Sequence, residues 1–182
     1  MPFTFQTTKL DGVIIVTPKV FPDPRGFFIE LFKTSEFQNS NIPGVFKQIN
    51  FAHSNKGIVR GLHYQIPPFE QGKLVKCVRG KIFDVAVDIR KHSSTFGRWT
   101  GFNLSESNNK MVYIPPGYAH GFYTLSDNTN VMYLLTNEYS PEYERGIIWN
   151  DPQLHIQWPD GEKNLSERDK DFPKLMEAEV FP

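Results

Sequence analysis

Two adjacent apolar segments, residues 73–79 and 81–89, constrain the fold of this chain most strongly. Both are rich in valine and isoleucine, and a single glycine, Gly80, separates them. In the second segment apolar side chains alternate with positions that include Asp84 and Asp88, which is the period of a strand with one buried face. We therefore expect two β-strands here, joined at Gly80 as a hairpin.

Short strand-like segments recur along most of the chain, and turn-forming residues separate them. Besides the two above, they are residues 13–17, 27–32, 45–52, 58–64, 98–104, 110–114, 121–125 and 131–136. Helical patterns are confined to residues 34–40, which Thr34 or Ser35 would cap, and to residues 173–179. Residues 160–172 are polar and loop-like. Many short strands at this spacing favour an all-β antiparallel sandwich or barrel with a few short helices.

The length and composition fit one folded domain over residues 1–182. The 20 basic and 20 acidic residues give a formal net charge of zero, and no basic stretch indicates a nucleic-acid partner. The 16 phenylalanines predict an aromatic-rich core or a site lined with rings. Cys77 is the only cysteine, which excludes an internal disulfide, and its apolar surroundings predict a small buried thiol.

No segment predicts an association with a membrane. The first ten residues contain no apolar core of the length that a signal peptide needs. No apolar run approaches the length of a membrane-spanning helix. We therefore expect a cytoplasmic protein with neither a membrane nor a nucleic-acid partner.

The segment at residues 58–65, IVRGLHYQ, carries the most chemistry. In a regular strand Arg60 and His63 would point to opposite faces, but a bulge near Gly61 could bring them together. With Lys73 also close in sequence, two cations beside the imidazole would disfavour its protonation and keep it available as a base. The same cations could bind an anion such as a phosphate. The alternative is a histidine with only a packing role.

A second histidine follows a rigid turn, in the run PPGYAH that ends at His120. Together the two segments resemble the motifs of metal-binding cupin β-barrels, which supply His-x-His, then Glu, then a final His. The corresponding positions here hold His63, Gln65, Glu70 and His120, which is one histidine short. Because Lys73 would also repel a dication, we expect no metal.

Three carboxylates and one tyrosine are further candidates. Asp84, in the middle of its strand, is a candidate partner for a histidine because a buried carboxylate needs one. Asp88, near the strand end, is expected to be solvated or to cap a turn, and Asp169 by itself would be an ordinary loop residue. Tyr133 is either a core aromatic or a weak acid that reaches a cavity from the wall opposite His63.

A series of motifs carries a resemblance that covers nearly the whole chain. They are PKVFPDPRGFFxE from Pro18, QxN from Gln48, VRGLHYQ from Val59, GKLVKC from Gly72, FDVAVDIR from Phe83, STFG from Ser94, IPxGxAHGF from Ile114, YSP from Tyr139, WNDP from Trp149 and LSxRD from Leu165. In these motifs the sequence resembles the dTDP-4-dehydrorhamnose 3,5-epimerase family. The resemblance implies an antiparallel jelly-roll β-barrel of cupin type.

The resemblance also implies an activity. The family converts dTDP-4-dehydro-6-deoxyglucose to dTDP-4-dehydrorhamnose in rhamnose biosynthesis, by inverting C3 and C5 through an enolate and without a cofactor. His63 would be the base, Asp169 would hold its imidazole, and Tyr133 would return a proton from the other face.

The remaining roles follow from the same resemblance. Lys73 would stabilise the enolate oxygen at C4, and Asp84 would pair with His120. The positions that would bind the nucleotide or the sugar of a dTDP-4-keto-6-deoxyhexose are Phe21, Arg25, Phe27, Glu30, Gln48, Asn50, Arg60, Lys73, His120, Glu144 and Arg168.

A homodimer is also implied, in which N-terminal strands over about residues 1–35 exchange between protomers. Arg25 and Glu30 would then serve the partner's site. Two positions depart from the family pattern: the spacing around Glu144 varies, and lysine also occurs where Arg168 stands here.

Three alternatives remain open at this stage. The nearest is a single 3-epimerase of another dTDP-deoxysugar pathway, and a more distant one is a metal-dependent cupin oxygenase. The third is a sugar-nucleotide binder without catalysis.

Overall fold

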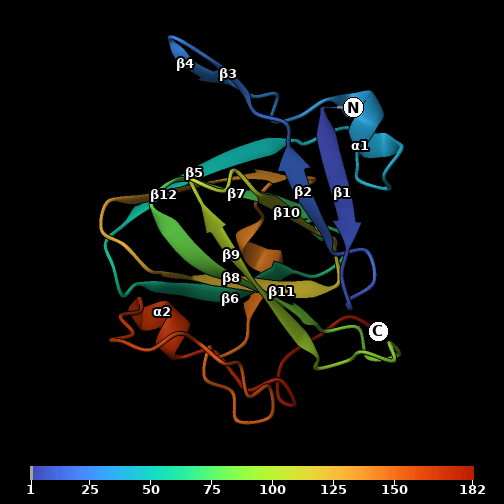
Figure 1. Cartoon of the computed structure of the whole chain (residues 1–182). Helices are drawn as coiled ribbons and strands as arrows, with labels where there is room; N and C mark the ends of the chain where they lie inside the picture. The colour runs from blue at the N-terminus through green and yellow to red at the C-terminus, as the bar shows by residue number, and fades with distance from the viewer. Residues whose placement is uncertain (1) are drawn as a thin grey trace.

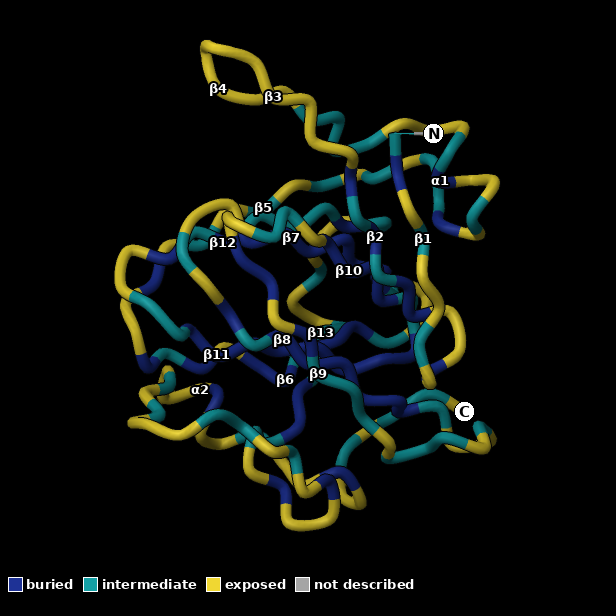
Figure 2. Tube along the Cα trace, viewed as in Figure 1, coloured by how far each residue is buried: buried dark blue, intermediate teal, exposed yellow. Residues whose placement is uncertain are grey.

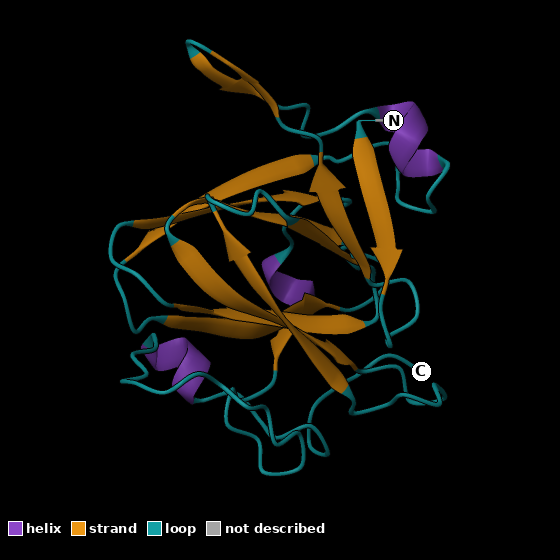
Figure 3. Cartoon of the chain, viewed as in Figure 1, coloured by secondary structure: helices purple, strands orange, loops and turns teal. Residues whose placement is uncertain are grey.

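Two antiparallel β-sheets face each other in the computed structural model, which describes residues 2–182 (Figure 1). The six-stranded sheet has the order β1-β2-β10-β7-β12-β5 and the five-stranded sheet the order β13-β6-β11-β8-β9. The strands are β1 Phe3–Thr7, β2 Ile14–Pro18, β3 Phe21–Asp23, β4 Gly26–Phe28, β5 Gln48–Ser54, β6 Val59–Gln65, β7 Lys73–Arg79, β8 Lys81–Asp88, β9 Trp99–Ser105, β10 Met111–Ile114, β11 Tyr118–Thr124, β12 Thr129–Leu135 and β13 Glu144–Gly146. Helices α1 Thr34–Gln38 and α2 Glu167–Lys170 and the 3-10 turn η1 Pro141–Tyr143 complete the fold (Figure 3). The predicted all-β antiparallel architecture is confirmed.

The predicted hairpin at Gly80 is wrong, although both of its strands are present. β7 pairs with β10 and β12, whereas β8 pairs with β9 and β11 in the other sheet. Gly80 has φ of +78°, and a Cβ there would come to 2.6 Å from the hydroxyl oxygens of Ser126 and Thr129. The glycine thus lets the chain cross from one sheet to the other in a crowded turn.

The ends of the chain depart most from the sequence prediction. In place of the expected strand 27–32, β4 ends at Phe28. It pairs only with the three residues of β3, and the two strands form a short hairpin that projects from the body (Figure 1). Helix α1 is present, but Lys33 is its N-cap and no side chain caps it, so neither Thr34 nor Ser35 has the predicted role.

Towards the C-terminus, residues 173–179 form turns instead of the predicted helix, and α2 lies within the predicted loop 160–172. Residues 2–182 include no helix that is both long enough and apolar enough to cross a membrane.

The core fills the space between the two sheets (Figure 2). Val75, Ile82, Val112 and Val131 are among its fully buried residues, and they come from strands of both sheets. Cys77 is buried with them, and burial raises the pKa of its thiol to about 11. The predicted small buried thiol is confirmed, because Cys77 is fully buried in the core.

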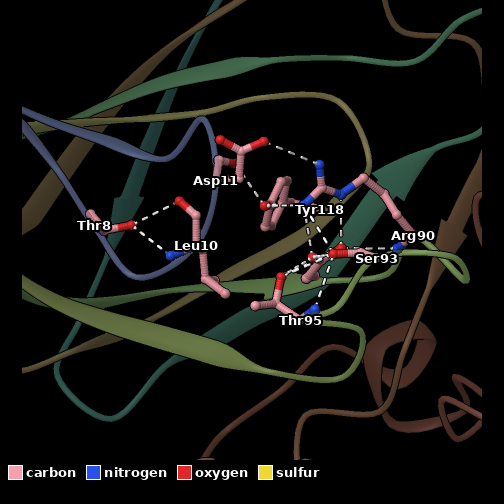
Figure 4. A network of polar contacts seen from close by, with 8 residues as sticks. Thr8, Leu10, Asp11, Arg90, Ser93, Thr95 and Tyr118 are labelled. Atoms are coloured by element: carbon pink, nitrogen blue, oxygen red, sulfur yellow. Dashed lines mark hydrogen bonds and ion pairs between the residues drawn. The ribbon is translucent and has the colours of Figure 1, made fainter.

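Asp88 is neither solvated nor exposed, contrary to one of its two predicted states. Its carboxylate is fully buried and accepts hydrogen bonds from Arg90 (2.8 Å from Nη2), Ser93 (2.6 Å) and Thr95 (2.6 Å). Arg90 also donates to the Tyr118 hydroxyl, so that these side chains converge beneath the turn between β1 and β2 (Figure 4). The predicted turn cap is confirmed, because the Arg90 amide donates to the same carboxylate.

Replacing this carboxylate should destabilise the fold. Burial by itself would raise the pKa of Asp88, but the hydrogen bonds from Arg90, Ser93 and Thr95 bring it down to about 2. We expect Asp88→Asn to lower the free energy of unfolding by about 2–4 kcal/mol at pH 7, measured by urea denaturation.

The contribution of the carboxylate is present above about pH 4 and is lost as the pH falls through 2, so the two proteins should converge in acid. Asp11→Asn is the control, because the Asp11 side chain is 94% exposed and lies 4.0 Å from Arg90. An equal loss in both variants would contradict the structural role of Asp88.

Candidate active site

A cavity of about 760 Å³ opens between the two sheets at the end where the chemistry-bearing residues gather. It is lined by these residues of the predicted site: Gln48, Asn50, Arg60, His63, Lys73, His120, Tyr133, Glu144, Arg168 and Asp169. Asp84 lies behind this wall, in contact with His120. The cavity therefore unites positions that are more than 100 residues apart in the sequence.

A histidine–carboxylate pair occupies one wall. His63 Nε2 lies 3.0 Å from Oδ1 of Asp169, and the other carboxylate oxygen accepts the Gly61 amide at 3.1 Å. Burial would raise the pKa of Asp169, but the hydrogen bonds from His63, Gly61 and Ser166 bring it to about 2. Asp169 is therefore an ionised acceptor, and it leaves Nδ1 of the imidazole as the nitrogen free to act on a ligand.

The predicted bulge near Gly61 is present. On β11, His120 pairs with His63 and Phe122 with Arg60, so two residues of β6 oppose the single residue Gly121. A Cβ on Gly61 would come to 2.5 Å from the Cα of Gly121, so only glycine allows this approach of the two backbones. The extra residue turns the side chains of Arg60 and His63 to the same cavity.

Lys73 brings a buried amine to the same place. It is 8% exposed, and its Nζ donates to the carbonyl oxygen of His63 at 3.1 Å. Burial lowers its pKa to about 8, and the charges of Asp84 and Glu144 oppose that shift. At neutral pH the group is mostly an ammonium, in surroundings where water screens its charge little.

A second buried pair joins His120 to Asp84. His120 Nε2 lies 2.8 Å from Oδ2 of Asp84, whose side chain is fully buried and whose Oδ1 has no partner. Burial lowers the pKa of His120 although Asp84 acts in the opposite direction, and the charge of Lys73 adds to the lowering. A neutral imidazole at His120 is therefore favoured. The predicted contact between Asp84 and a histidine is confirmed.

Tyr133 reaches the cavity from the opposite sheet. It lies on β12, paired with Asn50 of β5 and Val75 of β7, whereas His63 lies on β6 of the five-stranded sheet. The two side chains thus come to the cavity from facing walls. Tyr133 also packs against the core, so both of the alternatives that the sequence left open describe its position.

The mouth of the cavity is lined by a polar network. Arg168 pairs with Glu144 at 2.7 Å, and the Tyr139 hydroxyl donates to the same carboxylate oxygen at 2.7 Å. Gln48 accepts from the Tyr139 amide and donates to Asn50, each at 2.8 Å. Sequence reasoning missed Tyr139 as a site residue; its place before a Ser-Pro turn was the available signal.

Four predicted binding residues do not reach this cavity. Phe21, Arg25 and Phe27 lie on the projecting hairpin, and Glu30 follows it. Phe21 and Phe27 are 41% and 62% exposed, and Arg25 pairs only with its neighbour Asp23, at 2.6 Å. Within one protomer these residues therefore contribute nothing to the site.

At one of the positions that hold metal ligands in metal-binding cupins, the side chain makes hydrogen bonds to the backbone instead. Gln65, where a second histidine would stand, donates its amide to the carbonyl oxygens of Phe69 and Glu138. Among the residues from Pro2 onwards, no three side chains of His, Cys, Asp or Glu form a group that could hold a metal ion.

Both a family model and individual relatives match nearly the whole chain. Residues 7–177 match the model of the family described as dTDP-4-dehydrorhamnose 3,5-epimerase. A protein of that name from Shigella flexneri is 49% identical over 175 residues, which cover 96% of this chain and 97% of the relative.

Solved structures agree in fold. The dTDP-4-dehydrorhamnose 3,5-epimerase of Sulfolobus tokodaii has a TM-score of 0.93 at 48% identity, with all of both chains covered. The dTDP-6-deoxy-D-glucose-3,5-epimerase of Legionella pneumophila, solved with dTDP-4-keto-L-rhamnose, has a TM-score of 0.93 at 44% identity over 96% of this chain and 94% of that one. The predicted jelly-roll barrel of cupin type is confirmed.

Removing the buried amine should stabilise the protein. Because burial lowers the pKa of Lys73 from 10.5 to about 8, the folded protein binds this proton more weakly than the unfolded chain does. We expect Lys73→Met to raise the free energy of unfolding by about 1–3 kcal/mol at pH 7, measured by chemical denaturation.

The gain should fade as the pH rises from 8 to 10.5, where the amine is neutral in both states. Lys81→Met, at an exposed position of β8, is the matched control and should change little. A gain that does not depend on pH would mean that packing, rather than the buried charge, determines the result.

Proposed function

The chain belongs to the dTDP-4-dehydrorhamnose 3,5-epimerase family, and on this premise we propose that it converts dTDP-4-dehydro-6-deoxyglucose to dTDP-4-dehydrorhamnose by inverting C3 and C5. This is an isomerase reaction of rhamnose biosynthesis. The observation that carries the proposal is the His63–Asp169 pair, which faces one cavity with the buried Lys73 and with Tyr133.

The first step is removal of a proton next to the ketone. Nε2 of His63 is bonded to Asp169, so Nδ1 takes the proton from C3 or C5, and the electron pair moves into an enolate on the C4 oxygen. The Lys73 ammonium stabilises that developing charge, because a desolvated cation interacts strongly with it. The C4 ketone activates both neighbouring carbons, so one base serves both centres.

The second step is return of a proton to the opposite face. Tyr133 lies on the wall across from His63, and a phenol is acidic enough to protonate a strongly basic carbanion. Each centre loses one proton and regains one, so the reaction as written balances without a redox cofactor.

The His120–Asp84 pair completes the wall beside Lys73. With its Nε2 bonded to Asp84, His120 keeps Nδ1 for the sugar, and the buried carboxylate helps to hold the Lys73 amine in its charged form. His120 and Lys73 therefore also serve as binding residues.

The nucleotide diphosphate would lie at the mouth of the cavity. The side chains proposed to hold it are Gln48, Asn50, Arg60, Glu144 and Arg168. Arg60 and Arg168 supply the charge, since guanidinium groups bind phosphate oxygens in pairs.

A homodimer would complete the site. We propose that the chain is one domain over residues 1–182 and that about residues 1–35 exchange between protomers. Because β1 pairs with β2 and β2 with β10 in the protomer's own sheet, the part proposed to reach the partner's cavity is the projecting hairpin with Phe21, Arg25 and Phe27, together with Glu30. The exposed rings on the projecting hairpin support this, because isolated apolar hairpins of this kind need a partner surface. We also propose a cytoplasmic location.

Proton exchange with solvent tests the reaction directly. We expect the C3 and C5 proton signals of dTDP-4-keto-6-deoxyglucose to disappear in heavy water with the enzyme, followed by NMR. His63→Ala should lower both exchange rates at least about a hundredfold and leave the affinity for dTDP nearly unchanged.

Tyr133→Phe is the matched variant on the other wall, and it should slow inversion more than exchange. Exchange at C3 alone would identify a single 3-epimerase. No exchange at either centre by folded protein that binds dTDP would leave a binder without catalysis, and the epimerase proposal would then be wrong.

Mixed dimers test the exchanged strands. We expect His63→Ala protomers and Arg25→Ala/Phe27→Ala protomers to be poorly active alone. Co-expressed with different tags and purified as mixed dimers, they should regain activity, because one of the two sites then has every residue intact. Mixed dimers no more active than the parents would place Arg25 and Phe27 outside the partner's site.

A further inference from the structure

We propose that Phe172 is a positioning residue whose ring holds the His63 imidazole in the orientation that presents Nδ1 to the sugar. The two rings lie 5.4 Å apart between centroids at an interplanar angle of 77°, which is an edge-to-face arrangement. Phe172 does not line the cavity, so it would act only through His63. The expected effect on catalysis rests on the proposed function, whereas the contact between the two rings is independent of it.

Gly146 supplies the space for this ring. In the pairing of β13 with β6, Gly146 lies opposite His63, so side chains at the two positions would share one face. A Cβ at position 146 would come to 2.5 Å from Cδ2 and Cζ of Phe172, far inside the roughly 3.5–4.0 Å of carbon–carbon contact. The phenylalanine ring therefore fills the volume beside His63 that a side chain on the neighbouring strand would otherwise take.

Phe172 comes from the same short segment as Asp169. Asp169 binds His63 Nε2 at 3.0 Å, and the Ile148 amide donates to the Pro173 carbonyl at 2.9 Å, which fixes the chain next to Phe172. A single hydrogen bond still lets an imidazole tilt about that bond. The packed Phe172 ring restricts this tilt. Asp169 therefore fixes Nε2 of His63, and Phe172 fixes the plane of the imidazole.

Arg168, which lines the cavity, lies near the same ring. The guanidinium carbon of Arg168 lies 6.0 Å from the Phe172 centroid, and Arg168 pairs with Glu144. Phe172 is thus near both His63 and an arginine proposed to bind phosphate. A change that loosens the ring should affect the orientation of His63 more than binding, because Arg168 keeps its ion pair.

The chain contains a matched control for this arrangement. Phe83 covers Gly101 of the neighbouring strand, where a Cβ would overlap Cζ of the Phe83 ring and come to 2.6 Å from Cε2. The Phe83 ring also meets that of Trp158, with 6.0 Å between centroids and an interplanar angle of 77°. Each ring thus covers a glycine of a neighbouring strand, but Phe83 neither lines the cavity nor contacts the His63 ring in the way that Phe172 does.

The test compares Phe172→Leu, Phe172→Tyr and Phe83→Leu in full-length protein. We expect Phe172→Leu to lower kcat for C3 and C5 exchange about ten- to a hundredfold, with KM and dTDP affinity within about threefold of the original. Phe172→Tyr keeps the ring and should retain most activity, and Phe83→Leu should retain the original kcat per folded molecule. The carbon–proton NMR signals of the His63 imidazole should shift and broaden in Phe172→Leu alone.

Equal kcat and unchanged His63 signals in Phe172→Leu would overturn the proposal. If the unmodified protein exchanges neither proton, the proposed function fails, and the His63 signals still decide whether Phe172 holds the imidazole. If Phe172→Leu does not fold, Gly146→Ala is compared with Gly101→Ala, because the added methyl displaces a ring without removing it. A lower kcat in Gly146→Ala alone supports the positioning role, and equal kcat values contradict it.

Discussion

The carboxylate of Asp169 is the link on which the active-site wall depends. One oxygen accepts the Gly61 amide and the other faces His63, so a residue near the C-terminus is bonded to a bulge more than 100 positions earlier. The bulge itself exists because Gly61 and Gly121 let two backbones touch. The same segment places Arg168 at the cavity and Phe172 against the His63 ring. Two hydrogen bonds to the ionised Asp169 carboxylate, from the Gly61 amide and the His63 ring, therefore stabilise the bulge in β6.

The cavity brings three buried ionisable groups together in one part of the jelly roll. Lys73, Asp84 and His120 lie on three different strands and are each less than 9% exposed. An ammonium, a carboxylate and an imidazole in such a place disfavour folding individually, and their mutual contacts compensate only in part. Oδ1 of Asp84, for example, is buried without a hydrogen-bond partner. Stability given up at a functional centre and recovered in the surrounding core is the usual arrangement in enzymes.

The sequence predicted the strands well and their partners poorly. Alternation identified β8, and the need of a buried carboxylate for a partner made Asp84 a candidate contact of a histidine. Two buried strands in succession, however, look the same whether they pair with each other or, as here, with strands of opposite sheets. Patterns near the ends failed because tertiary contacts, not periodicity, determine whether residues 29–33 and 173–179 are regular. Asp169 was assigned only by resemblance, since a polar loop carries no sign of its distant partner. The sequence does not indicate the position of Phe172, because its ring packs over Gly146 on β13, a contact that only the tertiary fold creates.

The buried state of Cys77 has a practical consequence for labelling. It is the only cysteine in the chain, it lies in the core, and its sulfur donates to the carbonyl oxygen of Arg79. A thiol reagent therefore finds almost no native thiolate on the folded protein. A cysteine introduced on the projecting β3–β4 hairpin would be the single reactive group, and a fluorophore could be attached there without altering the native sequence elsewhere. The fold thus offers one position for a probe that reports whether two protomers associate as proposed.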